Sequence, residues 1–384
     1  MAGFVEAMKK IKWKRYVNYI GVGVALVLFS TLTLAGALRQ STLFLLEKIG
    51  ISIILSVSLG LVVGFLGELS LGHAGFMCIG AYIGGKTSAL LAATAVGNGV
   101  LNVFLSLIVG AAAAAAFGFV VGLPALRLKG DYLAIVTLAF CEIVKTIFEN
   151  SSTESFGGPM GLRTPRFDKN YLFIIIFALI LLCLVVIQNL IRSKHGRAIT
   201  AIRDNEIAAR ATGINVTKYK LAVFIISAAF AGVAGVMYSF ANSTVSSAGF
   251  DYNYSIEILV MVVLGGMGNV TGGIISAVVI TFLNMKLTTL LTGDYAVLKD
   301  LLYALILVVI VIYNNAPALR FIREKYNLKS LIAKVFNKKE DSSYDMDDEG
   351  KWDRVPTKIR MDELLSVDVV VRESVVDPDK ERKE

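Results

Sequence analysis

Long apolar segments constrain the fold of this chain more than any other feature. A helix of about 20 apolar residues crosses the hydrocarbon core of a bilayer, and backbone polar groups in lipid need partners within the protein. We therefore predict an all-α polytopic membrane protein with about ten transmembrane segments. They are Tyr16–Leu38, Ile49–Leu66, Gly72–Ala93, Val100–Leu123, Tyr132–Phe148, Tyr171–Ile191, Tyr219–Phe240, the short Ser255–Leu264, Thr271–Thr289 and Val297–Tyr313.

The composition agrees with this class. Of the 384 residues 55% are hydrophobic and 18% are charged, against about a quarter charged in soluble domains. The three cysteines, Cys78, Cys141 and Cys183, lie in apolar segments without a CxxC pattern, and there are only two histidines. We expect buried thiols and no metal site.

The net charge of +8 follows the membrane topology and does not indicate nucleic acid. Residues 1–315 carry 23 Lys and Arg against 14 Asp and Glu, whereas residues 316–384 carry 15 against 16. The basic excess lies at segment ends, so the positive-inside rule predicts that both termini are cytoplasmic. We expect residues 1–15 to form the cytoplasmic N-terminus, 16–315 the transmembrane domain and 316–384 a charged, mostly disordered cytoplasmic tail.

Two local features bear on this topology. Ala35-Gly36-Ala37 resembles a signal-peptide cleavage site, but the apolar segment before it is too long, which favours an uncleaved first span. An inside C-terminus needs an even number of crossings, so the chain must reverse at 265–269. Two spans, or one span with re-entrant half-helices, would both satisfy this.

A polar stretch at 192–218 separates two of the apolar segments. Asp204 is the expected N-cap of a helix there, Glu206 lies in its first turn, and Gly213 is expected to end it. Such a surface helix pair could dock a soluble partner, although an ordinary positive cytoplasmic loop would have the same charge.

Two glycine-interrupted segments match at a fixed offset and indicate an internal repeat with broken helices. Gly67 and Gly75 of the first coincide with Gly265 and Gly273 of the second. Broken helices in matching positions often line a transport pathway, although chance in a glycine-rich chain is the rival explanation. The pathway candidates are Gly67, Glu68, Gly72, His73, Gly75, Glu142, Gly265, Gly268 and Gly272.

Three polar candidates also have structural explanations. Glu68 could simply lie at the inner membrane edge, and His73 could hydrogen-bond a helix start. Glu142 lies one helical turn from Lys145 and is expected to face protein or a polar cavity. Residues 80–87 match the P-loop pattern, but they lie inside an apolar segment and not between a strand and a helix, so we expect no phosphate site.

Four motifs in order resemble the LivM/LivH-type permeases of branched-chain amino-acid ABC importers, and the LivM branch most. They are Ser70–Phe76 with Gly80-Ala81-Tyr82, Leu126–Leu138, Gly157–Leu162, and His195–Ala198 through Gly213-Ile214. The resemblance covers residues 45–315 and implies a type II importer-like fold. It implies a second LivH-like permease, two ATPase subunits that carry ATP and magnesium, and an extracytoplasmic binding protein. This chain would bind no cofactor and catalyse no reaction.

The resemblance also implies that residues 192–218, after the sixth span, couple to the ATPases. The coupling candidates are Gly196, Arg197, Ile202, Arg203, Asp204, Glu206, Ala209 and Gly213, with the apolar faces in an ATPase cleft. The implied location is a bacterial plasma membrane, and the implied substrates are leucine, isoleucine and valine. Urea, short amides, other amino acids, or a stand-alone secondary transporter using Glu142 remain alternatives.

Overall fold

The computed structural model describes residues 17–34, 39–94, 97, 99–128, 130–165, 167, 169–290, 305 and 308. The tenth segment expected at Val297–Tyr313, the N-terminal 1–15, the Ala35–Ala37 site and the 316–384 tail lie outside the described residues, apart from 305 and 308. The statements that follow concern the described part.

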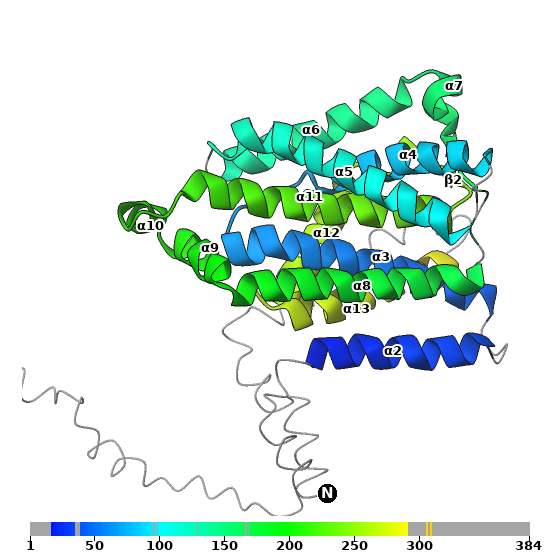
Figure 1. Ribbon diagram of the computed structural model, residues 1–384, viewed down its shortest axis with the longest axis horizontal. Helices are drawn as coiled ribbons and strands as arrows, with labels where there is room; N and C mark the ends of the chain where they lie inside the picture. Colours follow the sequence, from blue (N-terminus) through cyan, green and yellow to red (C-terminus); the bar gives the residue numbers. More distant parts are fainter. Residues whose placement is uncertain are drawn as a thin grey trace, which may run out of the picture. The chain divides into compact units, whose positions relative to one another are not determined.

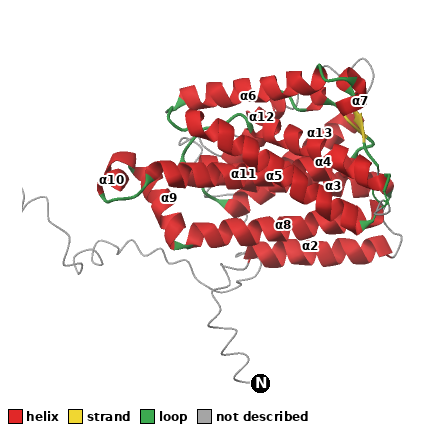
Figure 2. Cartoon of the chain, turned by 45° about the horizontal axis from the view of Figure 1, so that its top comes forward, coloured by secondary structure: helices red, strands yellow, loops and turns green. Residues whose placement is uncertain are grey.

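The first nine expected segments each correspond to a helix (Figures 1 and 2). These helices are α2 (Val17–Leu34), α3 (Gln40–Gly60), α4 (His73–Ala92), α5 (Val100–Ala125), α6 (Asp131–Glu149), α8 (Lys169–Arg192), α11 (Val216–Ala241), α12 (Tyr252–Gly265) and α13 (Val270–Leu290). A π-helical turn, η2 (Leu61–Leu66), continues α3.

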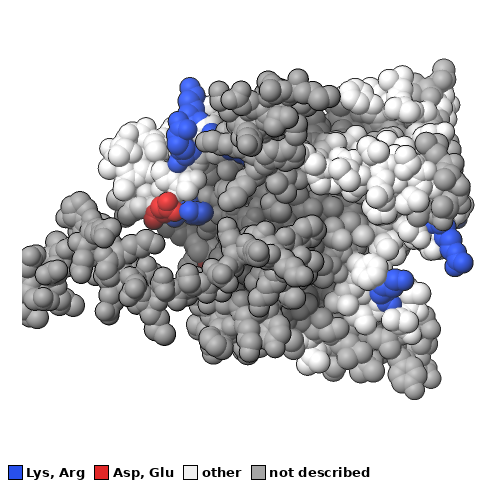
Figure 3. Space-filling model, turned by 90° about the horizontal axis from the view of Figure 1, so that it is seen from below, with Lys and Arg blue, Asp and Glu red and all other residues white. Residues whose placement is uncertain are grey.

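Shorter elements connect these helices. They are α7 (Thr153–Phe156), η3 (Gly158–Met160), α9 (Lys194–Asp204), α10 (Glu206–Ala211), η4 (Ser247–Gly249), and strands β1 (Leu162–Arg163) and β2 (Thr244–Val245). The two strands pair antiparallel, with Leu162 opposite Val245. On the face shown in Figure 3, charged side chains of the described part gather near the two ends.

Five helices are long and apolar enough to cross a membrane. They are Gln40–Leu66, Val100–Ala125, Tyr171–Arg192, Val216–Ala241 and Val270–Leu290. The first is the most buried, because α3 packs against α8, α11, α12 and α13. The 14 residues of α12 span only about 21 Å, less than the ~30 Å hydrocarbon core.

Small residues bring α4, α5 and α11 into backbone contact. A Cβ at Gly80 would overlap the backbone of Gly232, and one at Gly235 would overlap the Met77 carbonyl. In α5 the expected packing stretch 111–116 contributes Ala114, which is fully buried between the buried Gly110 and Gly118. Spacing of four residues places these three on one face, as in other membrane helix pairs.

The chain reverses between α12 and α13, as the charge pattern predicts. The two helices pack side by side and antiparallel, with Gly265 against Gly272 and Ser276 donating to the Met261 carbonyl. Gly266 and Gly268 have φ of 89° and 82°, a region that favours glycine, and so form the turn.

The first glycine break lies inside the bundle. Residues 67–72 are not helical, and Gly67 leaves η2 with a φ of 81°. The Leu71 N–H donates to Thr137 Oγ1 at 3.0 Å, so α6 supplies a partner for one of the backbone groups that the break leaves without an intrahelical hydrogen bond. The helix α4 begins at His73, whose ring contacts Ser58 of α3, and runs unbroken through the pattern at 80–87. That pattern is therefore helical and not a P-loop, and Lys86 donates to the Glu154 carbonyl at 3.0 Å.

We expect Gly80→Val to lower the free energy of unfolding by about 1–3 kcal/mol or more, because its side chain would overlap the backbone of α11. Gly21→Val is the matched control, since a Cβ at Gly21 in α2 meets nothing within 4 Å. Thermal unfolding of the two variants in detergent measures the difference. Equal melting temperatures would contradict the packing role of Gly80.

Candidate functional site

The polar stretch between α8 and α11 forms two short helices at one end of the bundle (Figure 1). Ser193 caps α9 by accepting hydrogen bonds from the N–H groups of His195 and Gly196, at 3.1 and 3.3 Å. A Cβ at Gly196 would overlap the Ile191 carbonyl. Glycine at this position therefore allows α9 to turn sharply away from α8.

The helix α10 has an N-cap one residue later than expected. Asn205, not Asp204, accepts from the Ala208 N–H at 3.0 Å, while Asp204 ends α9. Asn205 has the extended backbone of a cap, with φ −158° and ψ 103°. Glu206 lies in the first turn as predicted. Gly213 (φ 85°) follows the last turn as predicted, and the Ile214 N–H donates to the Ala209 carbonyl.

The apolar face of this helix pair packs against its own chain, which differs from the expected packing in a partner's cleft. Ile202 and Ala209 are 3% and 4% exposed. The exposed side chains of the pair include Arg197, Asp204, Arg210 and Ile207, of which Ile207 is 79% exposed. Helical spacing places Ile207 away from Ala209 and Ile202, so the face pointing away from the bundle has one large apolar residue.

Arg203 joins this helix pair to both glycine breaks. Its guanidinium donates to the Gly64 carbonyl at 3.2 Å and pairs with Asp204 at 2.9 Å. Its aliphatic stem covers Gly67, where a Cβ would come within 2.7 Å of Arg203 Cγ. Gly64 itself lies directly against the backbone of Gly268. The structure thus brings Gly67, Gly268 and Arg203, which are far apart in sequence, into one junction.

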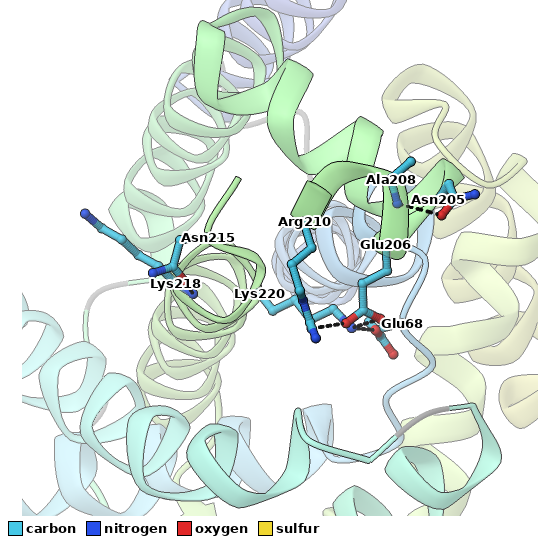
Figure 4. A network of polar contacts seen from close by, with 8 residues as sticks. All are labelled: Glu68, Asn205, Glu206, Ala208, Arg210, Asn215, Lys218 and Lys220. Atoms are coloured by element: carbon cyan, nitrogen blue, oxygen red, sulfur yellow. Dashed lines mark hydrogen bonds and ion pairs between the residues drawn. The ribbon is translucent and has the colours of Figure 1, made fainter. Parts of the chain in front are cut away.

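Beside this junction lies a cluster of four charged side chains, Glu68, Glu206, Arg210 and Lys220 (Figure 4). The Lys220 ammonium is 2.5 Å from Glu68 Oε1 and 3.2 Å from Glu206 Oε2, and Arg210 pairs with Glu206 at 2.8 Å. The Lys220 side chain is only 4% exposed. Two carboxylates therefore compensate one buried cation, and they tie α10 and α11 to the first glycine break.

The remaining pathway candidates have structural contacts. The buried His73 ring lies 2.8 Å from Ser58 Oγ in the last turn of α3, so it hydrogen-bonds a helix end and not a helix start. Gly72 and Gly75 lie against the backbone of α6. Glu142 is half-buried, pairs with Lys145 at 3.5 Å and accepts from the Tyr252 N–H at the start of α12.

Sequence reasoning missed four residues of this site, which are Gly64, Asn205, Ile207 and Lys220. From the sequence, Lys220 is only one of the basic residues at the segment ends. Nothing in its neighbourhood indicates Glu68, which lies 152 residues away. Asn205 has the same capping preference as Asp204, so composition could not separate them. Ile207 was visible as an apolar residue among charges, and only its exposure distinguishes it from Ile202.

Comparison with known proteins identifies the family. Residues 41–311 match the family described as the permease component of branched-chain amino acid transport systems. This chain belongs to that permease family. Its members are transport subunits, and the apolar helices described above agree with a multi-pass membrane protein.

Similar proteins support the LivM branch. The high-affinity branched-chain amino acid transport permease LivM of Escherichia coli K12 is 36% identical, over 74% of this chain and 71% of that protein. A probable LivM of Methanocaldococcus jannaschii is 27% identical, over 69% and 89%. The ribose import permease RbsC of E. coli K12 is a more distant relative, 27% identical over 57% and 70%. No solved structure matches this permease.

We expect Lys220→Met to destabilise the permease by about 3–5 kcal/mol, because two carboxylates lose the cation between them. The control is Lys218→Met. Lys218 is exposed, and its side chain points away from the cluster (Figure 4). Thermal unfolding in detergent measures both, and adding Glu68→Gln and Glu206→Gln to Lys220→Met should restore part of the stability. Equal stability of the two single variants would refute the role of the cluster.

Proposed function

We propose that this chain is one permease half of an ATP-driven importer for leucine, isoleucine and valine, and that the α9–α10 pair receives an ATPase subunit. The complex would contain a second, LivH-like permease, two ATPases and an extracytoplasmic binding protein in a bacterial plasma membrane. Both termini of the chain and α9–α10 would be cytoplasmic. ATP and magnesium would bind to the partner subunits and not to this chain.

The observation that carries the proposal is the attachment of a surface helix pair to the inner ends of broken membrane helices. Arg203 holds α9 to Gly64, and Lys220 holds α10 to Glu68 through Glu206. A force that moves α9 and α10 would therefore act directly on the backbone that follows α3. It would also act on Gly268 at the α12–α13 turn, because Gly64 lies against it.

In this mechanism the exposed face of the α9–α10 pair makes the contact with the ATPase. Ile207 supplies apolar area, while Arg197, Asp204 and Arg210 fix the register by charge. Ile202 and Ala209, packed inward, would instead transmit the movement. The backbone at the glycine breaks, 67–75 and 265–272, would bend as the two permease halves rock around the pathway.

The contacts of Glu142 argue against a stand-alone secondary transporter. Such a transporter needs an ionisable group in mid-membrane that binds a coupling ion. Glu142 already accepts a backbone N–H of α12 and pairs with Lys145. A secondary transporter also has no evident use for a structured helix pair joined to the glycine breaks.

We expect Ile207→Asp to weaken co-purification with the ATPase subunits roughly 30-fold or more, as for an apolar residue at the centre of an interface. Binding-protein-stimulated ATP hydrolysis and leucine uptake into proteoliposomes should fall with it. The fold should be unchanged, because Ile207 is 79% exposed.

The matched control is Met160→Asp. Met160 is 86% exposed but belongs to η3, away from the helix pair, so its replacement should leave ATPase binding unchanged. Replacing Glu206 or Arg203 discriminates less well, because it also breaks contacts within the chain. Normal ATPase binding and uptake by Ile207→Asp would refute the docking surface. Absence of leucine uptake by the wild-type complex would refute the importer.

A further inference from the structure

A cavity of about 220 Å³ lies among α3, α11, α12, α13 and the η4 turn. Its volume is far above the ~10–15 Å³ that one water molecule needs. Lys48 lies near the start of α3, whereas Gly64 and Glu68, which contact the helix pair, lie past the end of α3. The cavity is thus at the end of α3 away from α9 and α10. Its lining includes Phe44, Lys48, Ser52, Tyr238, Phe250 and Glu257.

The cavity has a cation and an anion on different helices. The Lys48 ammonium lies 4.1 Å from the centre of the Tyr238 ring and 5.4 Å from that of Phe44. A ring face attracts the charge, but it does not replace the oxygen acceptors that three ammonium N–H groups can use. Glu257 on α12 lines the same cavity and accepts from Asn284 Nδ2 at 3.0 Å.

The same cavity also has an apolar part. Phe44, Phe250 and Met285 line it together with the two charged side chains, so the cavity combines charged and apolar groups.

Charged side chains within membrane helices are costly, and here two of opposite sign face one cavity. We propose that this cavity binds the zwitterion of a free apolar amino acid, with the ligand carboxylate at Lys48 and the ligand ammonium at Glu257. The aliphatic side chain lies along Phe44, Phe250 and Met285. The proposal rests on the proposed importer function, for which it names the residues that receive the amino acid on the side away from the ATPases.

The direct test is binding of leucine to the purified full-length permease in nanodiscs, measured by saturation-transfer NMR without ATPase or binding protein. Lys48→Met and Glu257→Gln should each weaken leucine binding roughly tenfold or more, because each removes one charged partner. Thr281→Val, which keeps the side-chain shape and removes a hydroxyl that is not accessible from the cavity, should leave binding unchanged. Lys286→Met is the control, because Lys286 is exposed on the same helix and does not line the cavity.

Two ligand analogues test the two charges. Leucinamide lacks the carboxylate and 4-methylpentanoate lacks the ammonium, so neither should compete with leucine. Thermal unfolding of each variant shows whether it is folded. Wild-type protein that binds no leucine, or Lys48→Met and Glu257→Gln variants that are folded and bind it normally, would overturn the assignment.

A zwitterionic lipid headgroup presents the same pair of charges, so the lipid is varied too. Nanodiscs without phosphatidylethanolamine should leave leucine binding unchanged, and glycerophosphoethanolamine should not compete. Competition by that headgroup would make the cavity a lipid site and overturn the proposal. Leucine binding without ATP-driven uptake would refute the importer and leave the cavity assignment standing. Uptake without binding in this cavity would refute the cavity assignment and leave the importer standing.

Discussion

Backbone-to-backbone packing at glycine is the interaction on which the other features of this bundle depend. In lipid, burying apolar side chains between helices gains little, because the lipid tails are equally apolar. Association then relies on close contact, and the contacts at Gly80 with Gly232, and Gly265 with Gly272, leave no room for a side chain. These contacts fix the spacing of α4 to α11 and of α12 to α13.

Other glycines create a second constraint, because the chain leaves its helical path at Gly67 inside the bundle, and the freed backbone groups there need partners within the protein. Thr137 supplies an acceptor for the segment after Gly67, and Arg203 supplies a donor for the Gly64 carbonyl. One of these partners comes from the membrane bundle and the other from the polar loop. The loop therefore supplies a hydrogen-bond donor to the backbone of the broken helix. It is joined to the membrane bundle in addition to presenting an exposed surface.

Helix α3 and its π-helical continuation connect the two regions to which we assign functions. Lys48 lies near its beginning, at the proposed amino-acid cavity, and Gly64 and Glu68 lie at its end, under the proposed ATPase contact. Its burial by four neighbouring helices makes it a stiff connection. A displacement at the loop end would thus reach the cavity through one continuous element.

The sequence alone determined nine helices, the reversal at 265–269, the first-turn Glu206 and the role of Gly213, because hydropathy, capping and left-handed glycine are local properties. It predicted Asp204 as the cap, which was wrong, because Asn205 caps α10. The tertiary structure decided which faces pack inward, as for Ile202 and Ala209, and which charges meet, as for Lys220 with Glu68. It also placed Glu142 where it accepts from the Tyr252 N–H at the start of α12, and gathered Lys48 and Glu257 around one cavity. The physical reason is that burial and charge pairing depend on neighbours more than 100 residues away, which local residue chemistry does not specify.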